Sequence, residues 1–255
     1  MTREIEAHET NRGPAEGIPV PPPHLRVQVT GRHAERGAWL AEGATDANLI
    51  RSMLRRNEAP LETMDAVLDF GCGCGRVARN WSELRDPEVH GADVSRRAVR
   101  WCRRNLSFMR TVRSGPEPPL PYADGKFDFV YALSVFTHLP DETARRWLLE
   151  LTRVLRPGGL LLFTVHGERF LHELDEDDSM RFRRGELVVV ERAPELAGTN
   201  SFASFHPPRY VREDFLQIAD VELVEAVYVD PTGRGVTPMP VQDNYLVRKR
   251  NPASG

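Results

Sequence analysis

Apolar and polar positions alternate in blocks along the chain from about residue 65 onward. Short apolar runs with the length of buried strands recur there, separated by segments whose apolar residues fall three or four positions apart. The strand-like runs are DAVLDF (65–70), EVHGAD (88–93), SFMRTV (107–112), KFDFVYAL (126–133) and GLLLFTV (159–165). Because strands separated by helices form βαβ units, this alternation predicts a parallel sheet with helices on both faces.

Helices are predicted between these strands from the spacing of apolar side chains. The first follows residue 76 and has an apolar face of Val77, Ala78, Trp81 and Leu84. The second starts after Ser95, a typical N-cap residue, and we expect its inward residues to be Val94, Ala98, Trp101 and Cys102. The third opens at Pro140-Asp141, ends at RPGG (156–159), and carries a stripe of Ala144, Trp147, Leu148, Leu151 and Leu155.

The two ends of the chain depart from this alternation. VELVEAVYVD (221–230) and DNYLVRKR (243–250) are strand-like and have no helix between them, so we expect an antiparallel pair at one edge of the sheet. Residues 1–24 are polar, end in a proline cluster and predict an extended arm or partly disordered tail. A helix near residues 34–40 and another starting at Thr45-Asp46 predict a small helical lobe, the latter with Leu49, Ile50, Met53 and Leu54 inward.

We therefore expect an α/β fold of the doubly wound, Rossmann-like kind. Its sheet is mostly parallel and mixed at one edge. Residues 1–60 form an N-terminal arm and helical cap, residues 61–250 form the main domain, and a further cap or insert lies around residues 167–210.

Composition narrows the classes of function. The 255 residues carry a formal net charge of −3, without the basic excess of a nucleic-acid binder. No run of 18 apolar residues predicts a membrane span, and the charged N-terminus lacks a signal-peptide core, so we expect a cytoplasmic protein. Five arginines on the second helix fall mostly opposite its apolar stripe, so we expect a solvated face rather than an RNA-binding one: Arg96, Arg97, Arg100, Arg103 and Arg104.

Three cysteines, Cys72, Cys74 and Cys102, are too few and too oddly spaced for a disulfide framework. The spacing Cys72-x-Cys74 is also narrower than that of zinc sites, and no second ligand pair lies nearby in the sequence. We predict neither disulfides nor a metal site.

The segment VLDFGCGCGR (67–76) carries the chemistry. Asp69 ends an apolar run and is followed by Gly71, Gly73 and Gly75. Glycine-rich turns after a strand bind nucleotides in open α/β sheets, and Gly73-x-Gly75-x-x-Ala78 followed by Asp93 formally matches the fingerprint of dinucleotide sites. A carboxylate beside a pyrophosphate is unfavourable, however. S-adenosylmethionine suits the same geometry better, because it has an adenosine ribose and a cationic chain in place of the pyrophosphate.

At these residues the chain resembles the class I S-adenosylmethionine-dependent methyltransferases. VLDFGCGCG looks like their first motif and HGADVS their second; LPYADGKFDFVYALSVFTHL resembles the segment around their fourth strand and LTRVLRPGGLLLFT the entry to the fifth. The resemblance covers roughly residues 60–249. It implies a seven-stranded sheet with a reversed last strand and S-adenosyl-L-methionine as cofactor.

The resemblance also implies roles for single residues. Asp69, Gly71, Cys72, Gly73 and Gly75 form the turn on the methionine side, and Asp93 takes the ribose hydroxyls with Val94 beside the adenine. Leu133 and Ser134 touch the methionine portion or the methyl group. Many members bind the adenine amine with an acid after the third strand, and here SGPEPPLP offers no clear equivalent; Glu117, or the backbone of Ser114 or Gly115, takes that part.

Histidines are candidates for a catalytic base, which an acceptor needs only if it must lose a proton. His166 after the fifth strand and His138 after the fourth stand at strand ends, where active sites gather. His206 could arrive from the insert, where Phe202, Phe205 and Tyr210 could roof a substrate pocket. Each of these residues also has a packing interpretation, and the acidic run ELDEDD (173–178) is typical of a solvated helix.

The acceptor is predicted to be a small polar molecule, methylated on oxygen or nitrogen. There is no N-P-P-[YF] element after the fourth strand, which weighs against DNA bases, and no basic stripe with interleaved aromatics, which weighs against RNA. By association with similar bacterial enzymes we expect a sugar or secondary metabolite, and a monomer or homodimer. Two alternatives stay open: a methyltransferase-like partner subunit without its own activity, and an NAD-dependent oxidoreductase, which Asp69 disfavours.

Overall fold

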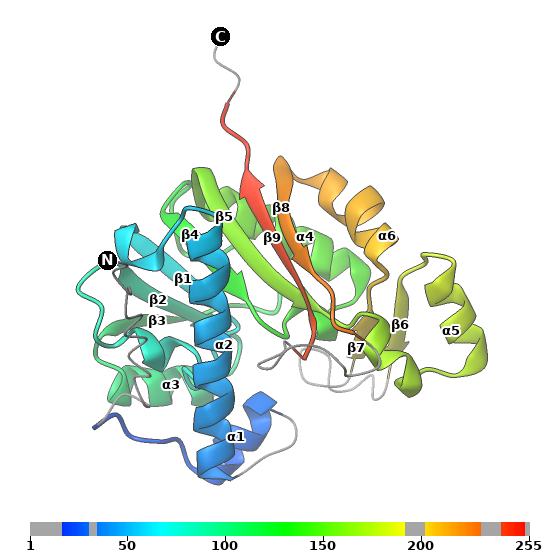
Figure 1. Ribbon diagram of the computed structural model, residues 1–255. Coiled ribbons are helices and arrows are strands. Elements are labelled where there is room, and N and C mark those ends of the chain that lie inside the picture. Colours follow the sequence, from blue (N-terminus) through cyan, green and yellow to red (C-terminus); the bar gives the residue numbers. More distant parts are fainter. Residues whose placement is uncertain (1–16, 31–34, 192–201, 231–240, 253–255) are drawn as a thin grey trace, which may run out of the picture.

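A central seven-stranded sheet organises the chain in the computed structural model, which describes residues 17–30, 35–191, 202–230 and 241–252 (Figure 1). Its strand order is β3-β2-β1-β4-β5-β9-β8. The strands are β1 (Ala66–Phe70), β2 (Glu88–Asp93), β3 (Met109–Arg113), β4 (Phe127–Ala132), β5 (Leu155–Val165), β8 (Val221–Val227) and β9 (Asp243–Lys249). Strands β1 to β5 pair in parallel, whereas β9 runs antiparallel to both β5 and β8. The predicted fold, with its single reversed last strand, is confirmed.

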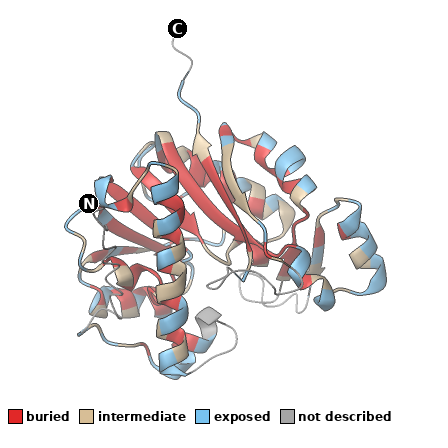
Figure 2. Ribbon diagram, in the orientation of Figure 1, coloured by how far each residue is buried: buried red, intermediate tan, exposed pale blue. Residues whose placement is uncertain are grey.

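Helices cover both faces of this sheet. Helix α2 (Arg36–Arg56), the 3₁₀ turn η2 (Ala78–Trp81) and α3 (Arg96–Asn105) pack on one face, and α4 (Asp141–Val154) packs on the other (Figure 1). The strands between them are largely buried (Figure 2). The remaining short helices are α1 (Pro23–Thr30), η1 (Leu61–Thr63), η3 (Phe136–His138), η4 (Glu168–Glu173), α5 (Glu176–Arg183), α6 (Pro208–Tyr210), η6 (Val211–Phe215) and η7 (Leu216–Ile218).

Two of the predicted helix boundaries before β2 are wrong. Helix α2 runs without a break through Thr45-Asp46, and its N-cap is Glu35, which accepts a hydrogen bond from the Gly37 amide at 2.8 Å. Asp46 instead pairs with Arg76 at 2.7 Å. Gly43 is tolerated in the helix because a Cβ there would lie 2.3 Å from the Arg76 carbonyl oxygen, so the missing side chain allows close packing.

The predicted helix from Val77 to Leu84 shrinks to the turn η2. The Asn80 side chain donates to the Val77 carbonyl at 2.9 Å, and such local side-chain bonds compete with a regular helix. The predicted N-terminal arm is also shorter, because α1 already begins at Pro23, a residue suited to the first turn. Residues 1–16 of the arm lie outside the described residues.

The remaining predictions on these elements mostly hold. Ser95 caps α3 by accepting from the Ala98 amide at 3.3 Å, and the five arginines of this helix are exposed. Val94, however, is exposed rather than inward, with 38 % of its surface accessible. Helix α4 ends at Val154, and Leu155 together with RPGG already belongs to β5.

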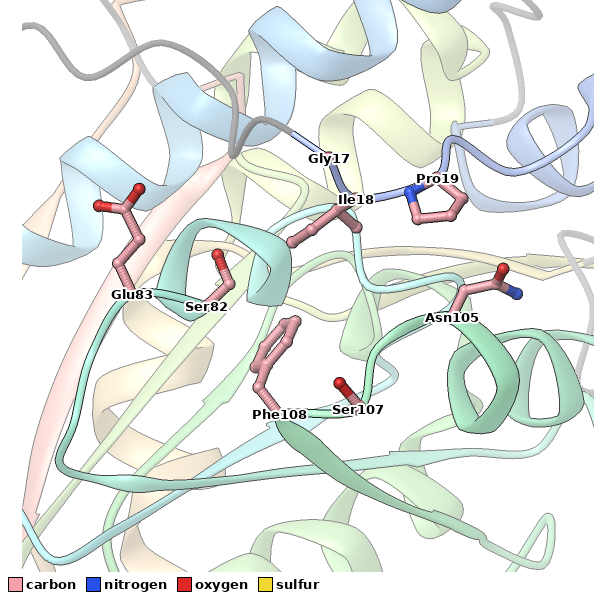
Figure 3. A pocket seen from close by; sticks show the side chains of 8 residues that line it. All are labelled: Gly17, Ile18, Pro19, Ser82, Glu83, Asn105, Ser107 and Phe108. Atoms are coloured by element: carbon pink, nitrogen blue, oxygen red, sulfur yellow. The ribbon is translucent and has the colours of Figure 1, made fainter.

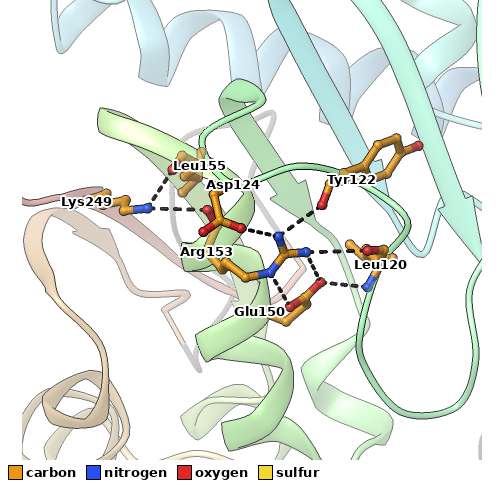
Figure 4. A network of polar contacts seen from close by, with 7 residues as sticks. All are labelled: Leu120, Tyr122, Asp124, Glu150, Arg153, Leu155 and Lys249. Atoms are coloured by element: carbon orange, nitrogen blue, oxygen red, sulfur yellow. Dashed lines mark hydrogen bonds and ion pairs between the residues drawn. The ribbon is translucent and has the colours of Figure 1, made fainter.

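A polar network fixes α4 at the edge of the sheet opposite the glycine turn (Figure 4). Arg153 donates to Glu150 at 2.7 Å and to Asp124 at 2.6 Å, and Glu150 accepts the Leu120 amide at 2.6 Å. Lys249 of β9 donates to the Leu155 carbonyl at 2.7 Å. These bonds join α4 to the loop before β4 and to the last strand.

A hairpin of β6 (Val188–Glu191) and β7 (Phe202–Phe205) forms a second, smaller sheet in the region of the predicted insert. Its own apolar cluster includes Phe170, Phe182 and Phe205. The hairpin is joined to the main sheet by a parallel bridge between His166 and Phe205. The predicted boundaries at residues 60, 167 and 210 stay predictions.

Candidate functional site

The glycine turn follows the carboxyl end of β1 as predicted, and it requires its glycines. Gly71, Gly73 and Gly75 have φ of +78°, +51° and +68°, in the left-handed region that favours glycine. A Cβ on Gly71 would lie 2.3 Å from Val135 Cγ2, and one on Gly75 would lie 2.3 Å from Leu106 Cδ1. The Gly71 amide donates to the Ala92 carbonyl at 2.8 Å, which ties the turn to β2.

Asp69 is a buried acid at the start of this turn, only 5 % exposed. Its carboxylate is hydrogen-bonded by the Tyr131 hydroxyl, which in turn accepts from the Trp81 indole nitrogen at 2.9 Å. Burial raises the pKa of Asp69 to about 7, and the Asp93 charge adds to this, whereas the bond from Tyr131 and the Arg76 charge oppose it. Because burial disfavours the charged carboxylate, a cationic ligand beside Asp69 would stabilise its ionised form.

Asp93 ends the neighbouring strand β2 and faces the same turn. One of its oxygens accepts the Gly73 amide at 2.7 Å, and the other accepts the Ser95 amide at 2.7 Å. Burial raises its pKa, and these two bonds act against the rise. Since a carboxylate has about four acceptor positions, Asp93 can still accept bonds from two ribose hydroxyls. The exposed Val94 lies next to it in sequence.

The end of β4 adjoins the glycine turn. Leu133 packs against the apolar cluster on the α2 face of the sheet. Ser134 has a φ of +55°, unusual for a residue with a side chain, and its amide donates to Thr164 Oγ1 at 2.8 Å. The next residue, Val135, is the one that lies against Gly71. The structure thus brings the predicted β1, β2 and β4 residues to one edge of the sheet.

Two of the three candidate histidines lie together. The rings of His138 and His166 are perpendicular, with centroids 6.2 Å apart. His138 Nδ1 donates to the Phe202 carbonyl at 3.0 Å. The His166 ring lies 4.2 Å from Phe170 and 5.3 Å from Phe205, measured between centroids.

The backbone of the third histidine, His206, lies beside His166, because its amide donates to the His166 carbonyl at 2.8 Å. Its ring packs among other rings, with its centroid 5.9 Å from that of Tyr210 and 6.2 Å from that of Phe215. Burial lowers the pKa of His206 to about 4. The Tyr210 hydroxyl donates to Asp141 of α4. Of the residues predicted near the substrate, Phe205 packs beside His166, whereas the rings of His206 and Tyr210 pack against each other. Contact of these residues with an acceptor stays a prediction.

The cysteines pack around the turn as free thiols. Cys102 Sγ donates to the Gly73 carbonyl at 3.3 Å, and the Cys72 side chain lies in the core on the α2 face. A contact of Cys72 with the cofactor would therefore involve its backbone. Within the described ranges, no three His, Cys, Asp or Glu side chains are placed to hold a metal ion.

The partner of the adenine amine stays open. Glu117 accepts from Thr143 at 3.1 Å and from Arg146 at 3.3 Å, both on α4. The Ser114 amide donates to the Asp93 carbonyl at 3.1 Å.

Sequence reasoning missed Tyr131, Trp81 and Thr164 as supports of this site. Tyr131 could not be found, because its place opposite Asp69 depends on the register of β1 against β4. Thr164 gave no signal, because its role depends on the turn at Ser134.

A separate hollow of about 410 Å³ lies away from this site (Figure 3). It is bounded by Gly17–Pro19 of the arm, by Ser82 and Glu83, and by the segment from Asn105 to Phe108. This segment connects the end of α3 to the start of β3, at the edge of the sheet opposite the glycine turn. No predicted site residue lines it.

Comparison with known proteins agrees with this geometry. A family model described as a methyltransferase domain matches residues 67–159, from β1 into β5. The chain carries a class I S-adenosylmethionine-dependent methyltransferase domain. The cofactor of this domain is S-adenosylmethionine, which the acids and the glycine turn fit.

Similar methyltransferases match part of the chain. The 27-O-demethylrifamycin SV methyltransferase of Amycolatopsis mediterranei is 32 % identical over 54 % of this chain and 52 % of its own length. Methyltransferase GfsG of Streptomyces halstedii is 36 % identical over 54 % of this chain and 51 % of its own. The chain thus spans about half the length of these two relatives.

A solved structure shares the fold over nearly the whole chain. The 1,6-didemethyltoxoflavin-N1-methyltransferase of Burkholderia thailandensis, solved with 1,6-didemethyltoxoflavin and S-adenosylhomocysteine, has a TM-score of 0.58 and 19 % identity. The match covers 91 % of this chain and 92 % of that one. Among the described residues, no helix combines the length and apolar character needed to cross a membrane.

Proposed function

We propose that this chain transfers the methyl group of S-adenosylmethionine to an oxygen or nitrogen of a small polar metabolite. The observation that carries the proposal is the pair of acids flanking the glycine turn at the ends of β1 and β2. Asp69 is buried with a pKa raised to about 7, as suits a partner for a cation. Asp93 keeps acceptor positions for a ribose while bonding Gly73 and Ser95.

The chain's own residues bind the cofactor and position its reacting end. When bound, S-adenosylmethionine supplies a methyl group on a sulfonium, which is already activated for displacement. Asp69, Asp93 and the glycine turn bind and orient it, and the end of β4 positions the reacting end. Because the remaining requirement is alignment with the acceptor, positioning is the main contribution of the protein.

A base is required if the acceptor is a hydroxyl, and His166 is our first candidate. It directly follows β5, at the carboxyl ends of the parallel strands, where Asp69 and Ser134 also lie. His138 lies beside it, with centroids 6.2 Å apart, and its Nδ1–H is engaged by the Phe202 carbonyl. In the neutral ring this tautomer leaves the lone pair on Nε2. Either ring could take the proton of the acceptor.

The class of acceptor follows by analogy from relatives. The name of the Amycolatopsis relative specifies an oxygen of a rifamycin, and that of the Burkholderia enzyme a nitrogen of a toxoflavin precursor. Neither name specifies a nucleic acid or a protein as the acceptor. Phe170 and Phe205 pack beside the His166 ring as buried members of the hairpin's apolar cluster, so the surroundings of this histidine are apolar.

The test is methyl transfer from isotope-labelled S-adenosylmethionine to a panel of hydroxyl- and amine-bearing metabolites and sugars, with products identified by mass spectrometry. For a hydroxyl acceptor, His166→Ala should lower turnover by roughly 10²- to 10⁴-fold with cofactor affinity intact. For an amine acceptor it should cost much less and mainly shift the pH optimum.

His172→Ala is the matched control, since His172 is an exposed histidine bonded only locally to the Arg169 carbonyl in the described structure. Wild-type turnover in both His138→Ala and His166→Ala across pH 6 to 9 would show that neither is an obligatory base. Failure of wild-type protein to bind S-adenosylmethionine would contradict the proposed function as a whole.

A further inference from the structure

Three polar side chains join the ends of β4, β5 and β9 beside the glycine turn. Gln242 precedes β9, and its Oε1 accepts two hydrogen bonds: one from the Thr164 hydroxyl at 2.6 Å and one from the Ser134 hydroxyl at 2.9 Å. Thr164 Oγ1 also accepts the Ser134 amide at 2.8 Å. Residues 108 positions apart in the chain are therefore held in one small network.

The network surrounds a strained residue. Ser134 has a φ of +55°, where the Cβ of a residue other than glycine is crowded. Such conformations persist when neighbouring groups determine them, and they cluster at functional sites. Both the amide and the hydroxyl of Ser134 donate into the network, so Thr164 and Gln242 together hold the conformation.

The conformation of Ser134 affects the cofactor turn through Val135. A Cβ on Gly71 would lie 2.3 Å from Val135 Cγ2, so this valine packs directly on the backbone of the turn. A change of φ at Ser134 would swing Val135 relative to Gly71. Gln242 is thereby connected to the glycine turn through two residues.

We propose that Gln242 is a positioning residue for cofactor binding: it holds the left-handed conformation of Ser134, and through Val135 the geometry of the glycine turn. This inference depends on the proposed function, which places the cofactor at that turn. An amide oxygen suits the task because it accepts two hydroxyl donors at once.

The test is a double-mutant cycle with S-adenosylhomocysteine as the probe, measured by calorimetry on the full chain. Gln242→Leu removes the acceptor, and Ser134→Gly removes the need for it, because glycine adopts positive φ without support. We expect Gln242→Leu to weaken affinity by about fivefold or more in the wild-type background, and by less than about twofold in the Ser134→Gly background. This difference between backgrounds separates positioning from a general loss of stability.

Two further variants keep the test decisive. Thr164→Val removes the hydroxyl that bonds both Ser134 and Gln242 and keeps a similar side-chain shape. It replaces Gln242→Leu in the cycle if that variant does not fold, and it should weaken affinity in the wild-type background but not in the Ser134→Gly background. Gln217→Leu is the matched control, an exposed glutamine bonded to the Arg212 carbonyl, and should leave affinity unchanged.

The inference would be overturned if Gln242→Leu weakened S-adenosylhomocysteine affinity equally in both backgrounds, or did not weaken it in the wild-type background. Binding by the wild-type protein would still uphold the proposed function. Absence of binding by the wild-type protein would overturn both.

Discussion

Asp69 is the residue that distinguishes the possible ligands of the glycine turn. Its carboxyl group is buried at the end of β1, and the hydroxyl of Tyr131 and the indole of Trp81 support it from the α2 face. A pyrophosphate at this turn would meet a carboxylate in a region of low dielectric, whereas an ammonium group would be stabilised there. The acid could be identified from the sequence, but its supports could not, because they depend on the register of β1 against β4.

The pH dependence of cofactor affinity tests this role. Burial raises the pKa of Asp69 to about 7 in the free protein, and a bound cation favours the ionised carboxylate. Below pH 7 the free protein therefore carries a proton that must leave on binding, so affinity rises with pH through this range. We expect S-adenosylhomocysteine to bind roughly tenfold more tightly at pH 7.5 than at pH 6, measured by calorimetry.

Asp69→Asn serves as the control, since it cannot titrate. Its affinity should be weaker than that of the wild-type protein at pH 7.5 and nearly constant between these pH values. An unchanged pH dependence in this variant would show that another group is responsible.

Gly71 is the residue of the turn with the clearest steric requirement. Gly71→Ala would place a Cβ 2.3 Å from Val135 Cγ2 at a φ of +78°, so we expect S-adenosylhomocysteine affinity to fall at least about tenfold, the scale of 1.4 kcal/mol. Gly125→Ala is the matched control, with a similar φ of +68° but no atom closer than 3.6 Å, in the loop before β4. It should lower the melting temperature but not the affinity, and an equal loss of affinity in both variants would contradict the role of the turn.

At the scale of elements, strands were predicted better than helices. The buried runs of β1, β4 and β5 are short and continuous, so their pattern survives in any tertiary context. Helix α2 and the turn η2 were misjudged because their limits depend on distant or side-chain partners: Arg76 beside Gly43 and Asp46, and the back-bonding Asn80. Local propensity does not contain these contacts.

Ser95 is the N-cap that the sequence predicts for helix α3, and the structure confirms it. Ser95→Ala removes the bond to the Ala98 amide at the N-terminus of the helix, so we expect a loss of about 1 kcal/mol in the free energy of unfolding. In thermal denaturation this corresponds to roughly 2–4 °C for a chain of this size. Ser107→Ala, at an exposed position after the helix, should leave the melting temperature unchanged. Equal melting curves for Ser95→Ala and wild-type protein would show that the cap does not stabilise α3.

At the scale of the whole molecule, the parallel sheet gathers the candidate residues at one edge. Asp69, Asp93, Ser134 and His166 come from the carboxyl ends of four strands, and the order of the motifs in the sequence predicted this gathering. The sequence could not predict that the His206 ring packs against Tyr210 while its backbone amide donates to the His166 carbonyl, because the direction of each side chain depends on how β7 joins β5. Gln242 gave no signal either, because its partners lie 78 and 108 positions earlier in the chain.

The most direct test of the account is a calorimetric comparison of S-adenosylhomocysteine with NAD⁺ on the wild-type protein and on Asp93→Ala. We expect S-adenosylhomocysteine to bind with a low-micromolar dissociation constant or tighter, about −8 kcal/mol, and NAD⁺ not to bind measurably. Asp93→Ala should weaken S-adenosylhomocysteine binding by about 1.5–3 kcal/mol, the scale of hydrogen bonds to charged groups. Tighter binding of NAD⁺, or unchanged S-adenosylhomocysteine affinity in a folded Asp93→Ala variant, would contradict the assignment of the glycine turn and its two acids to S-adenosylmethionine.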